Sequence, residues 1–279
     1  MLDFFVDASR CVQCGECAAD CPVSVIDLTQ GLPRILPHKE GYCIGCQHCL
    51  AVCPTAALSI FGIDPDTVEL CAPPAPDVIE NQLRGRRSVR RFRTEPVDGA
   101  ILERLLRVTA HAPTGKNQRS VYLSLIDDPG VMQAVREKTI MGIRQAAVSG
   151  TLPEGLECYA KFVNLYDQGQ DIIFRDAPHM LVVSAPAASP APEADPFITM
   201  TYFEIMASAL GLGAVWCGFA AWAFDRVVPK LRDMLGVPPD HRSLYAMMFG
   251  YPAVRYARVT KRDIRNVRRV TMADLDFAR

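Results

Sequence analysis

Eight of the eleven cysteines of this chain form two copies of one spacing. The first copy reads C-x2-C-x2-C-x3-C-P, and the second repeats it 32 residues later, from Cys11 to Cys43. Three thiolates at this spacing wrap a short loop around one cubane of iron and sulfide, and such a cubane carries single electrons. The pattern therefore predicts one-electron chemistry. The eight cysteines are Cys11, Cys14, Cys17 and Cys21, followed by Pro22, and Cys43, Cys46, Cys49 and Cys53, followed by Pro54.

The last cysteine of each run is expected to serve the other cluster. The proline after it turns the chain away, so its thiolate reaches across to the neighbouring cubane. We therefore predict two 4Fe-4S clusters with exchanged ligands. The first set is Cys11, Cys14, Cys17 and Cys53, and the second is Cys43, Cys46, Cys49 and Cys21.

Two other uses of cysteine fit the spacing less well. Structural zinc pairs two C-x2-C knuckles, and a third cysteine would be left over in each copy. Disulfides need an oxidising compartment, and the first five residues have neither the basic nor the long apolar region of a secretion signal. We expect reduced cysteines and a cytoplasmic protein.

Size and composition indicate a globular protein of about two domains. The chain has 279 residues, of which 49% are hydrophobic and 22% charged, so it can bury a core. Its net charge of −1 provides no global attraction to nucleic acid or anionic lipid, and we expect neither as a partner.

One apolar stretch, Ile205 to Phe224, is uncharged over twenty residues, which is long enough to cross a membrane. Glycines at 211, 213 and 218 interrupt it, and its flanks are acidic rather than basic. A buried helix, a glycine-rich turn and a buried strand fit the same letters, so we expect no membrane association.

The chain divides into three parts and belongs to the α+β class. Residues 1–62 hold the cysteine runs and are too few to fold without metal. A proline-rich linker spans 63–76, and residues 77–279 alternate helices and strands in a mixed α/β sandwich. Caps are expected at Asp77 and Asp98. Helices are predicted at 77–83, 98–108, 130–148, 196–210 and 227–235, and strands at 121–126, 180–184, 214–219 and 244–249.

A second group of chemical interest is a basic segment, Arg84 to Arg93, with six arginines in ten residues. Planar guanidinium groups beside a serine hydroxyl make a good phosphate clamp. A solvated basic surface or a nucleic-acid contact fits the same residues. From the residues alone, these three uses remain open.

The basic segment is the first of several motifs that recur together in one family. Residues from about 77 to 265 resemble the nitroreductase family, and the whole chain resembles its subgroup with an N-terminal two-cluster ferredoxin. The motifs that carry the resemblance are Arg86-Arg87-Ser88-x-Arg90-x-Phe92, Ala112-Pro113-Thr114-Gly115-Lys116-Asn117-Gln118, Asp176-Ala177-Pro178-His179, Gly211-Leu212-Gly213 with Trp216-Cys217-Gly218, and Gly250-Tyr251-Pro252 with Arg258, Lys261 and Arg262.

The resemblance implies FMN as the cofactor of this part. It places Arg86, Ser88 and Arg262 at the flavin phosphate, with Lys261 as an alternative to Arg262, and it includes Arg87 among the other FMN contacts. No residue is assigned a catalytic role, because the family delivers hydride from flavin N5 and the protein supplies position and charge.

The same resemblance assigns contacts to the flavin ring. Arg90 is expected near N1 and the C2 carbonyl, Asn117 at the pyrimidine edge, and the backbone N–H of Gly218 at N5. Gly115 would let the backbone approach closely. The remaining expected contacts are Pro113, Thr114, Gly213 and Cys217.

Some residues depart from the family or resist assignment. Arg119-Ser120-Val121 stands where the family commonly has Gln-Pro-Trp, which affects substrate contacts more than flavin contacts. Cys217 is expected to be a buried, inert thiol, and Trp216 and Trp222 are expected in the core. Residues 130–175 match no interpretable feature.

The predicted function is an FMN-dependent oxidoreductase with a built-in electron inlet. Reduced ferredoxin or NAD(P)H would donate, the clusters would relay, and the flavin would reduce a nitroaromatic, quinone or enone. A homodimer is expected, as in related folds. Two alternatives stay open: an electron-relay subunit of a larger redox complex, and a reductive dehalogenase or flavin-modifying enzyme on the same scaffold.

Overall fold

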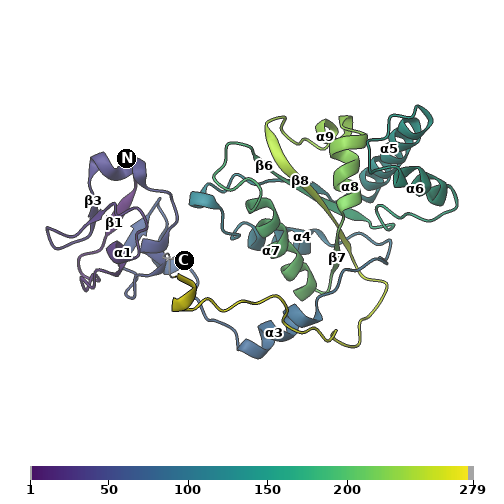
Figure 1. Ribbon diagram of the computed structural model, residues 1–279. Coiled ribbons are helices and arrows are strands. Elements are labelled where there is room, and N and C mark those ends of the chain that lie inside the picture. Colours follow the sequence, from purple (N-terminus) through teal and green to yellow (C-terminus); the bar gives the residue numbers. More distant parts are fainter. Residues whose placement is uncertain (1, 276–279) are drawn as a thin grey trace.

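The computed structural model describes residues 2–275 as a small and a larger domain (Figure 1). Met1 and residues 276–279, which the predicted ranges 1–62 and 77–279 include, lie outside the described residues. The small domain holds both cysteine runs. The larger domain is built around a four-stranded sheet with helices on both faces. The described residues include no helix long and apolar enough to cross a membrane.

The small domain repeats one backbone shape. Left-handed backbone occurs at Gln13 and again at Gly45, and at Gly15 and again at Gln47, each pair 32 residues apart. These residues curl each loop before a short helix that carries the third cysteine. Its elements are β1 (Phe4–Val6) paired with β4 (Leu58–Ile60), β2 (Ile26–Asp27) paired with β3 (Arg34–Ile35), α1 (Glu16–Ala19), η1 (Pro37–Tyr42) and α2 (His48–Ala51).

The sheet of the larger domain has the order β5-β6-β8-β7, with every neighbour antiparallel. The two central strands are buried along most of their length, which is why they read as continuous apolar runs rather than as alternation. The strands are β5 (Tyr122–Ile126), β6 (His179–Pro186), β7 (Gly213–Trp216) and β8 (His241–Gly250).

The sheet separates two hydrophobic cores. Met180 and Val182 face the core covered by α5, α6 and α8, whereas Leu181 and Val183 face the core covered by α4 and α7. Side chains of α5 reach full burial in the first core, as Ile143 does. The helices are α3 (Pro76–Gly85), α4 (Gly99–Thr109), α5 (Pro129–Val148), α6 (Cys158–Asp167), α7 (Asp195–Ala209), α8 (Gly218–Trp222) and α9 (Lys230–Met234), with short turns η2 (Pro65–Thr67), η3 (Gly115–Asn117), η4 (Ala223–Val227) and η5 (Met272–Leu275).

Most predicted elements of the larger domain are present, and some end elsewhere. Asp98 caps α4 as expected, by accepting from the Ala100 N–H at 2.8 Å. The predicted cap at Asp77 is wrong, because Ala75 precedes α3 and Pro76 opens it, which leaves Asp77 inside the first turn. The strand predicted at 214–219 stops at Trp216, because the next residue turns and caps α8. Helix α6 was not predicted.

Candidate functional site: two sulfur-lined spaces and two arginine-lined cavities

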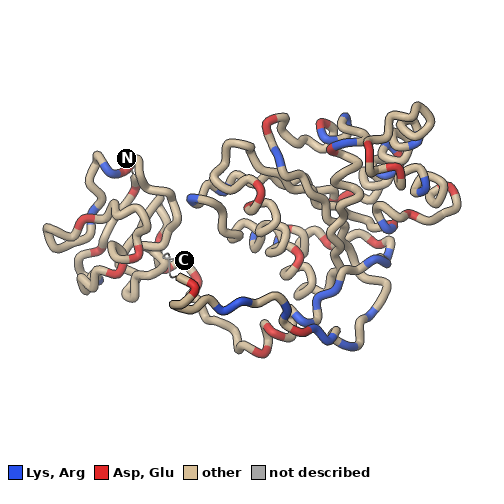
Figure 2. Tube along the Cα trace, in the orientation of Figure 1, with Lys and Arg blue, Asp and Glu red and all other residues tan. Residues whose placement is uncertain are grey.

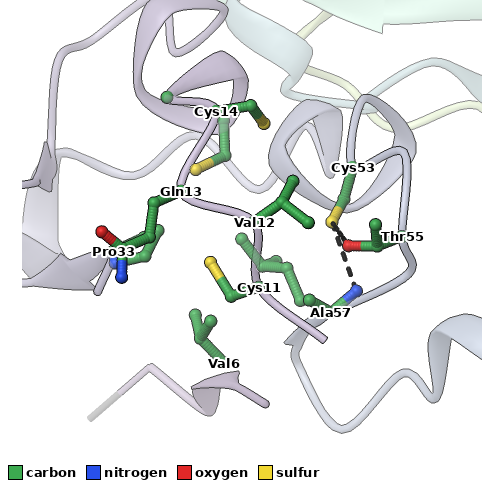
Figure 3. Close-up of a pocket in the computed structure, with 12 residues that line it drawn as sticks. Val6, Cys11, Val12, Gln13, Cys14, Pro33, Cys53, Thr55 and Ala57 are labelled. Carbon is green, nitrogen blue, oxygen red and sulfur yellow. Dashed lines mark hydrogen bonds between the residues drawn. The ribbon is translucent and has the colours of Figure 1, made fainter. Parts of the chain in front are cut away.

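The eight cysteines of the two runs gather around two spaces in the small domain. One space is lined by the predicted first set, Cys11, Cys14, Cys17 and Cys53. The other is lined by the predicted second set, Cys21, Cys43, Cys46 and Cys49. Figure 3 shows Cys11, Cys14 and Cys53 around the first space, with Val6 and Val12 beside them. Each space therefore receives three sulfurs from one run and one from the other.

The walls of both spaces suit an iron–sulfur cubane. Apolar side chains complete them, such as Val6 and Leu58 in the first and Ile26 and Ile60 in the second. An apolar surround limits access of water, which is one way in which a protein tunes a cluster. Among residues 2–275, no three His, Cys, Asp or Glu side chains converge closely enough to hold a single metal ion.

The thiols differ in their surroundings. Burial raises the pKa of Cys49 to about 11, and burial also raises the pKa of Cys17. Burial acts in the same direction on Cys53, but hydrogen bonds outweigh it and lower the pKa of that thiol. One of these bonds is donated by the Ala57 N–H to Cys53 Sγ at 3.2 Å. Bound iron would deprotonate any of these thiols, since a coordinating thiol loses its proton outright.

The arginine segment is hydrogen-bonded along one edge of the large sheet. The Val89 N–H donates to the Ala214 carbonyl at 2.9 Å, and the Arg93 N–H donates to the Tyr251 carbonyl at 2.8 Å. The segment thus bridges β7 and the residues after β8. A Cβ at position 213 would lie 2.6 Å from the Val89 side chain. The glycine there therefore permits the arginine segment to approach β7 closely.

Four of the predicted FMN contacts line one cavity: Arg86, Arg87, Lys261 and Arg262. Lys and Arg gather in Figure 2 where the segment after α3 meets the C-terminal segment. The buried Nε of Arg87 has no hydrogen-bond partner among the described residues, which is uncommon for a buried donor. Ser88, a predicted phosphate ligand, is absent from the residues that line this cavity.

Arg86 has a partner that the sequence did not reveal. Its Nη1 donates to Oε1 of Glu204 in α7 at 2.8 Å, and the Glu204 side chain is only 8% exposed. The other oxygen of Glu204 accepts from Trp216 Nε1 at 2.9 Å. Glu204 therefore fixes the position of Arg86 and neutralises part of its charge. No motif indicated this residue, because the spacing to Arg86 is 118 positions.

Only some of the predicted flavin contacts lie at a second cavity. Arg90, Cys217 and Gly218 line it, together with residues that we had not predicted: Ile172, Ile173, Arg175, Val215 and Phe219. The expectation that Trp222 lies in the core is wrong, since it lines this cavity and is 48% exposed. Trp216 lines it too, while its ring stacks on Phe197 at 5.8 Å.

Cys217 is the buried thiol that was expected. It is 8% exposed, and its Sγ donates to the Ile173 carbonyl at 3.1 Å. The same sulfur accepts from the Ala220 N–H and so caps α8. Burial raises the pKa of Cys217, which keeps it a thiol. Its role in this position is to anchor the start of α8, the turn that carries the Gly218 N–H.

The loop of Pro113, Thr114, Gly115 and Asn117 lies at neither arginine-lined cavity. The Gly115 N–H donates to both carboxylate oxygens of buried Asp195 at 3.1 Å, and a Cβ on Gly115 would lie 2.9 Å from Pro190. Asn117 has left-handed backbone and donates from Nδ2 to the Ile44 carbonyl, in the small domain, at 3.0 Å. One chain therefore does not bring this loop together with the other predicted flavin contacts.

Comparison with known proteins agrees with this division. A model of the nitroreductase family matches residues 83–251, and a model of the 4Fe-4S dicluster domain matches residues 4–60. The curated relatives include an NADH dehydrogenase of Thermus thermophilus, 29% identical over 60% of this chain and 83% of that protein, and a 5,6-dimethylbenzimidazole synthase of Rhodobacter capsulatus, 28% identical over 63% and 84%.

The fold is shared with solved structures. A nitroreductase with bound FMN from Desulfitobacterium hafniense has a TM-score of 0.54 at 18% identity, over 70% of this chain and 100% of that one. A second one, from Bacteroides fragilis, has a TM-score of 0.52 at 18% identity, over 71% and 99%. The predicted fold class and family resemblance are thereby confirmed. The chain belongs to the nitroreductase family of oxidoreductases and carries an N-terminal domain of the 4Fe-4S dicluster type.

Proposed function

We propose that this protein is an FMN-dependent oxidoreductase in which two 4Fe-4S clusters pass electrons from a low-potential donor to the flavin. The flavin would supply hydride transfer to an electron-poor small molecule, such as a nitroaromatic, a quinone or an enone. Family membership and the FMN-containing structural neighbours support the cofactor. The dicluster match and the two sulfur-lined spaces support the inlet. Reduced cysteines at such sites suit a cytoplasmic protein.

The residues at the two arginine-lined cavities fit the parts of FMN. The unpartnered Arg87 Nε, with Lys261 and Arg262, would hold the phosphate by charge-assisted hydrogen bonds. Arg90, in the cavity with Gly218, would offer a cation to the ring, where it stabilises negative charge. A Cβ on Gly218 would come within 3.2 Å of the Tyr245 hydroxyl, so only glycine leaves this wall unchanged.

The proposed relay rests on one observation, the hydrogen bond from Asn117 Nδ2 to the Ile44 carbonyl, which is 3.0 Å long. Ile44 follows Cys43 directly, in the loop that lines the second sulfur cavity. The next residue, Gly45, would place a Cβ 4.0 Å from the same Nδ2. The cysteine loop therefore rests on the loop for which the family resemblance implies a flavin contact. We infer that the cluster of Cys43, Cys46, Cys49 and Cys21 is the one that hands electrons to the flavin.

A homodimer belongs to this proposal. The Asn117 loop lies apart from the cavities of Arg87 and Arg90, so one chain leaves the expected flavin contacts in separate places. A second copy that brings its Asn117 loop to these cavities would complete the site. The cluster that rests on that loop would then face the flavin held by the other copy.

The relay is tested by following both cofactors in the anaerobic holoprotein. We expect reduced ferredoxin to bleach the cluster absorbance first and the flavin absorbance second in a stopped-flow experiment. If NADH or NADPH reduces the flavin directly while the clusters stay oxidised throughout, the inlet has no part in turnover and the proposal fails.

The contact itself is tested with Asn117→Ala, and Asn81→Ala, an exposed residue of α3, is the matched control. Loss of a neutral hydrogen bond of about 1 kcal/mol should lower, about fivefold, the population of molecules in which the Ile44 loop contacts the Asn117 loop. We expect the cluster-to-flavin phase to slow by that factor in Asn117→Ala alone, at unchanged iron content. FMN content is measured in parallel, and the rate is expressed per bound flavin. Equal rates in the two variants would contradict the contact.

A further inference from the structure

We propose that the cavity beside Gly218 selects acceptors that are aromatic and carry a carboxylate, and that Arg175 is the residue that binds the carboxylate. This inference rests on the proposed function, because it names the substrate class of the same site. It concerns a residue that no motif indicated and whose neighbourhood, residues 130–175, the sequence left without interpretation.

The cavity has an unusual balance of charge. Two guanidinium groups, of Arg90 and Arg175, line it together with three aromatic rings, of Trp216, Phe219 and Trp222. None of its lining residues is acidic. Within the described part of the chain, neither arginine has a carboxylate partner, and the side chain of Arg90 makes only a long bond of 3.5 Å to the Ser88 carbonyl. The cavity is therefore cationic and aromatic, and its positive charge is uncompensated.

The turn that carries Arg175 is strained and firmly held. Arg175 and Asp176 both have left-handed backbone, with φ of 59° and 53°. Non-glycine residues rarely adopt this conformation, and they persist in it only where the surrounding structure determines it. Such strain gathers at binding sites, because it fixes a side chain in place before the ligand arrives.

Buried hydrogen bonds hold this turn in its conformation. The carboxylate of Asp171 accepts from the Phe174 N–H at 2.8 Å and from the Asp176 N–H at 3.1 Å. Asp171 is itself paired with Arg136 at 2.9 Å, and both side chains are at most 9% exposed. Arg136 also donates to the Ala177 carbonyl at 2.9 Å, so both ends of the turn are tied to one buried ion pair.

Arg175 is close to the residues expected at flavin N5. It shares the cavity with Cys217 and Gly218. Burial raises the pKa of Cys217 and the positive charge of Arg175 opposes that rise, so the guanidinium lies within electrostatic reach of this thiol. If Arg90 serves the flavin ring, Arg175 is the cation that remains for the acceptor.

The chemistry of a guanidinium then selects the acceptor. Its planar fork binds both oxygens of a carboxylate, and an indole ring stacks on an aromatic acceptor. A neutral acceptor would leave the charge of Arg175 unpaired, and a cationic one would be repelled. The expected order of preference is therefore anionic, then neutral, then cationic aromatic acceptors.

Binding is measured without turnover, by the fluorescence of the oxidised holoprotein. The chain has two tryptophans, and both line this cavity, so a ligand there must perturb the signal. Benzoate and its neutral counterpart benzamide are the probes. We expect benzoate to bind at least about tenfold more tightly, as a charge-assisted bond implies. Equal affinity for the two probes would overturn the proposal.

Arg175→Asn removes the charge and keeps a residue that tolerates left-handed backbone. It should weaken benzoate binding about tenfold or more and change benzamide binding little. Arg175→Lys keeps the charge without the fork and should give an intermediate value. Arg226→Asn, an exposed arginine outside the cavity, is the matched control. If Arg175→Asn and Arg226→Asn bind benzoate alike, Arg175 does not hold the carboxylate.

Turnover separates this inference from the proposed function. We expect the ratio of kcat/KM for 4-nitrobenzoate to that for 4-nitrobenzamide to fall about tenfold in Arg175→Asn, through KM rather than kcat. A protein that binds benzoate through Arg175 but reduces neither compound would contradict the proposed acceptors and leave the anion site standing. If Arg175→Asn reduces both compounds with an unchanged ratio of kcat/KM, the carboxylate site is contradicted and the proposed function stands.

Discussion

The two domains reach a folded state by different means. The larger domain has two hydrophobic cores, one on each face of its sheet, filled by aliphatic and aromatic side chains such as Phe203 and Ile143. The small domain has a single core whose buried members are Cys17, Cys49, Leu50, Leu58 and Ile60. Two of these five are predicted cluster ligands. The small domain therefore lacks an apolar interior that is independent of its metal.

This difference joins stability and function more closely in the small domain than in the larger one. In the larger domain, the cavity residues Arg90 and Trp222 stand outside both cores, so these two side chains can change at little structural cost. In the small domain, a change at Cys49 alters the cluster and the core together.

Removal of iron is expected to have the largest effect. A chelator applied to the oxidised protein should unfold the small domain and leave the larger one folded. The reason is that metal binding supplies the folding free energy of a small metal-binding domain. Differential scanning calorimetry should then show one transition instead of two, at the midpoint of the larger domain. Retained protection from hydrogen exchange in β1 and β4 of iron-free protein would show that the small domain stands alone.

A core change in the larger domain should be smaller and confined to it. Gly142 of α5 faces Val228, and a Cβ there would lie 2.6 Å from both valine methyl groups. Since valine is stiff, we expect Gly142→Ala to lower the free energy of unfolding by about 1–3 kcal/mol. Urea titration should show this in the transition of the larger domain only.

Gly99, the first residue of α4, is the control for that substitution. A Cβ on Gly99 would meet nothing within 4 Å, and its backbone is helical. Gly99→Ala should stabilise the larger domain by about 0.4–1 kcal/mol, by restricting the unfolded chain. Effects of the same sign in both variants would mean that packing against Val228 is looser than the structure indicates.

The smallest expected effect is a dependence of the larger domain on pH. Burial lowers the pKa of His179 from 6.5, and its Nε2 accepts from the Val97 N–H at 2.8 Å, which requires the unprotonated ring. Below pH 6.5 the unfolded state therefore binds the proton first, and stability falls as the pH drops. Burial lowers the pKa of His241 too, in the same direction.

Unfolding free energies at about pH 7.5 and about pH 5.5, on either side of the ordinary histidine pKa, measure this effect. His179→Asn should lose part of the difference between the two values, whereas His111→Asn, at an exposed loop residue, should keep it. A larger domain whose stability rises on acidification would contradict the role given to His179.

Local signals made much of the fold predictable. The cap at Asp98 needs only its neighbours in sequence, and it forms as expected. The apolar runs of β6 and β8 report burial on both faces. The cysteine spacing predicted two sets of four sulfurs, and the structure gathers the same sets, while their cluster ligation stays a prediction.

What could not be predicted depends on contacts distant in sequence or on backbone conformation. Glu204 meets Arg86 only because α7 packs beneath the arginine segment, and no spacing rule covers such a pair. The left-handed backbone at Arg175 occurs at a residue that rarely adopts it. Trp222 was assigned to the core by its residue type, whereas its place at the end of a short helix exposes it.

The exchange of cysteines between the two sulfur cavities has a consequence for assembly. Cys53 crosses to the first cavity and Cys21 to the second, so a cubane inserted at either one ties both loops together. The first cluster then already restricts the loops that hold the second one. Insertion of the second cluster therefore costs less chain entropy. Loading should be cooperative, and protein matured on limiting iron should contain full and empty molecules with few half-filled ones.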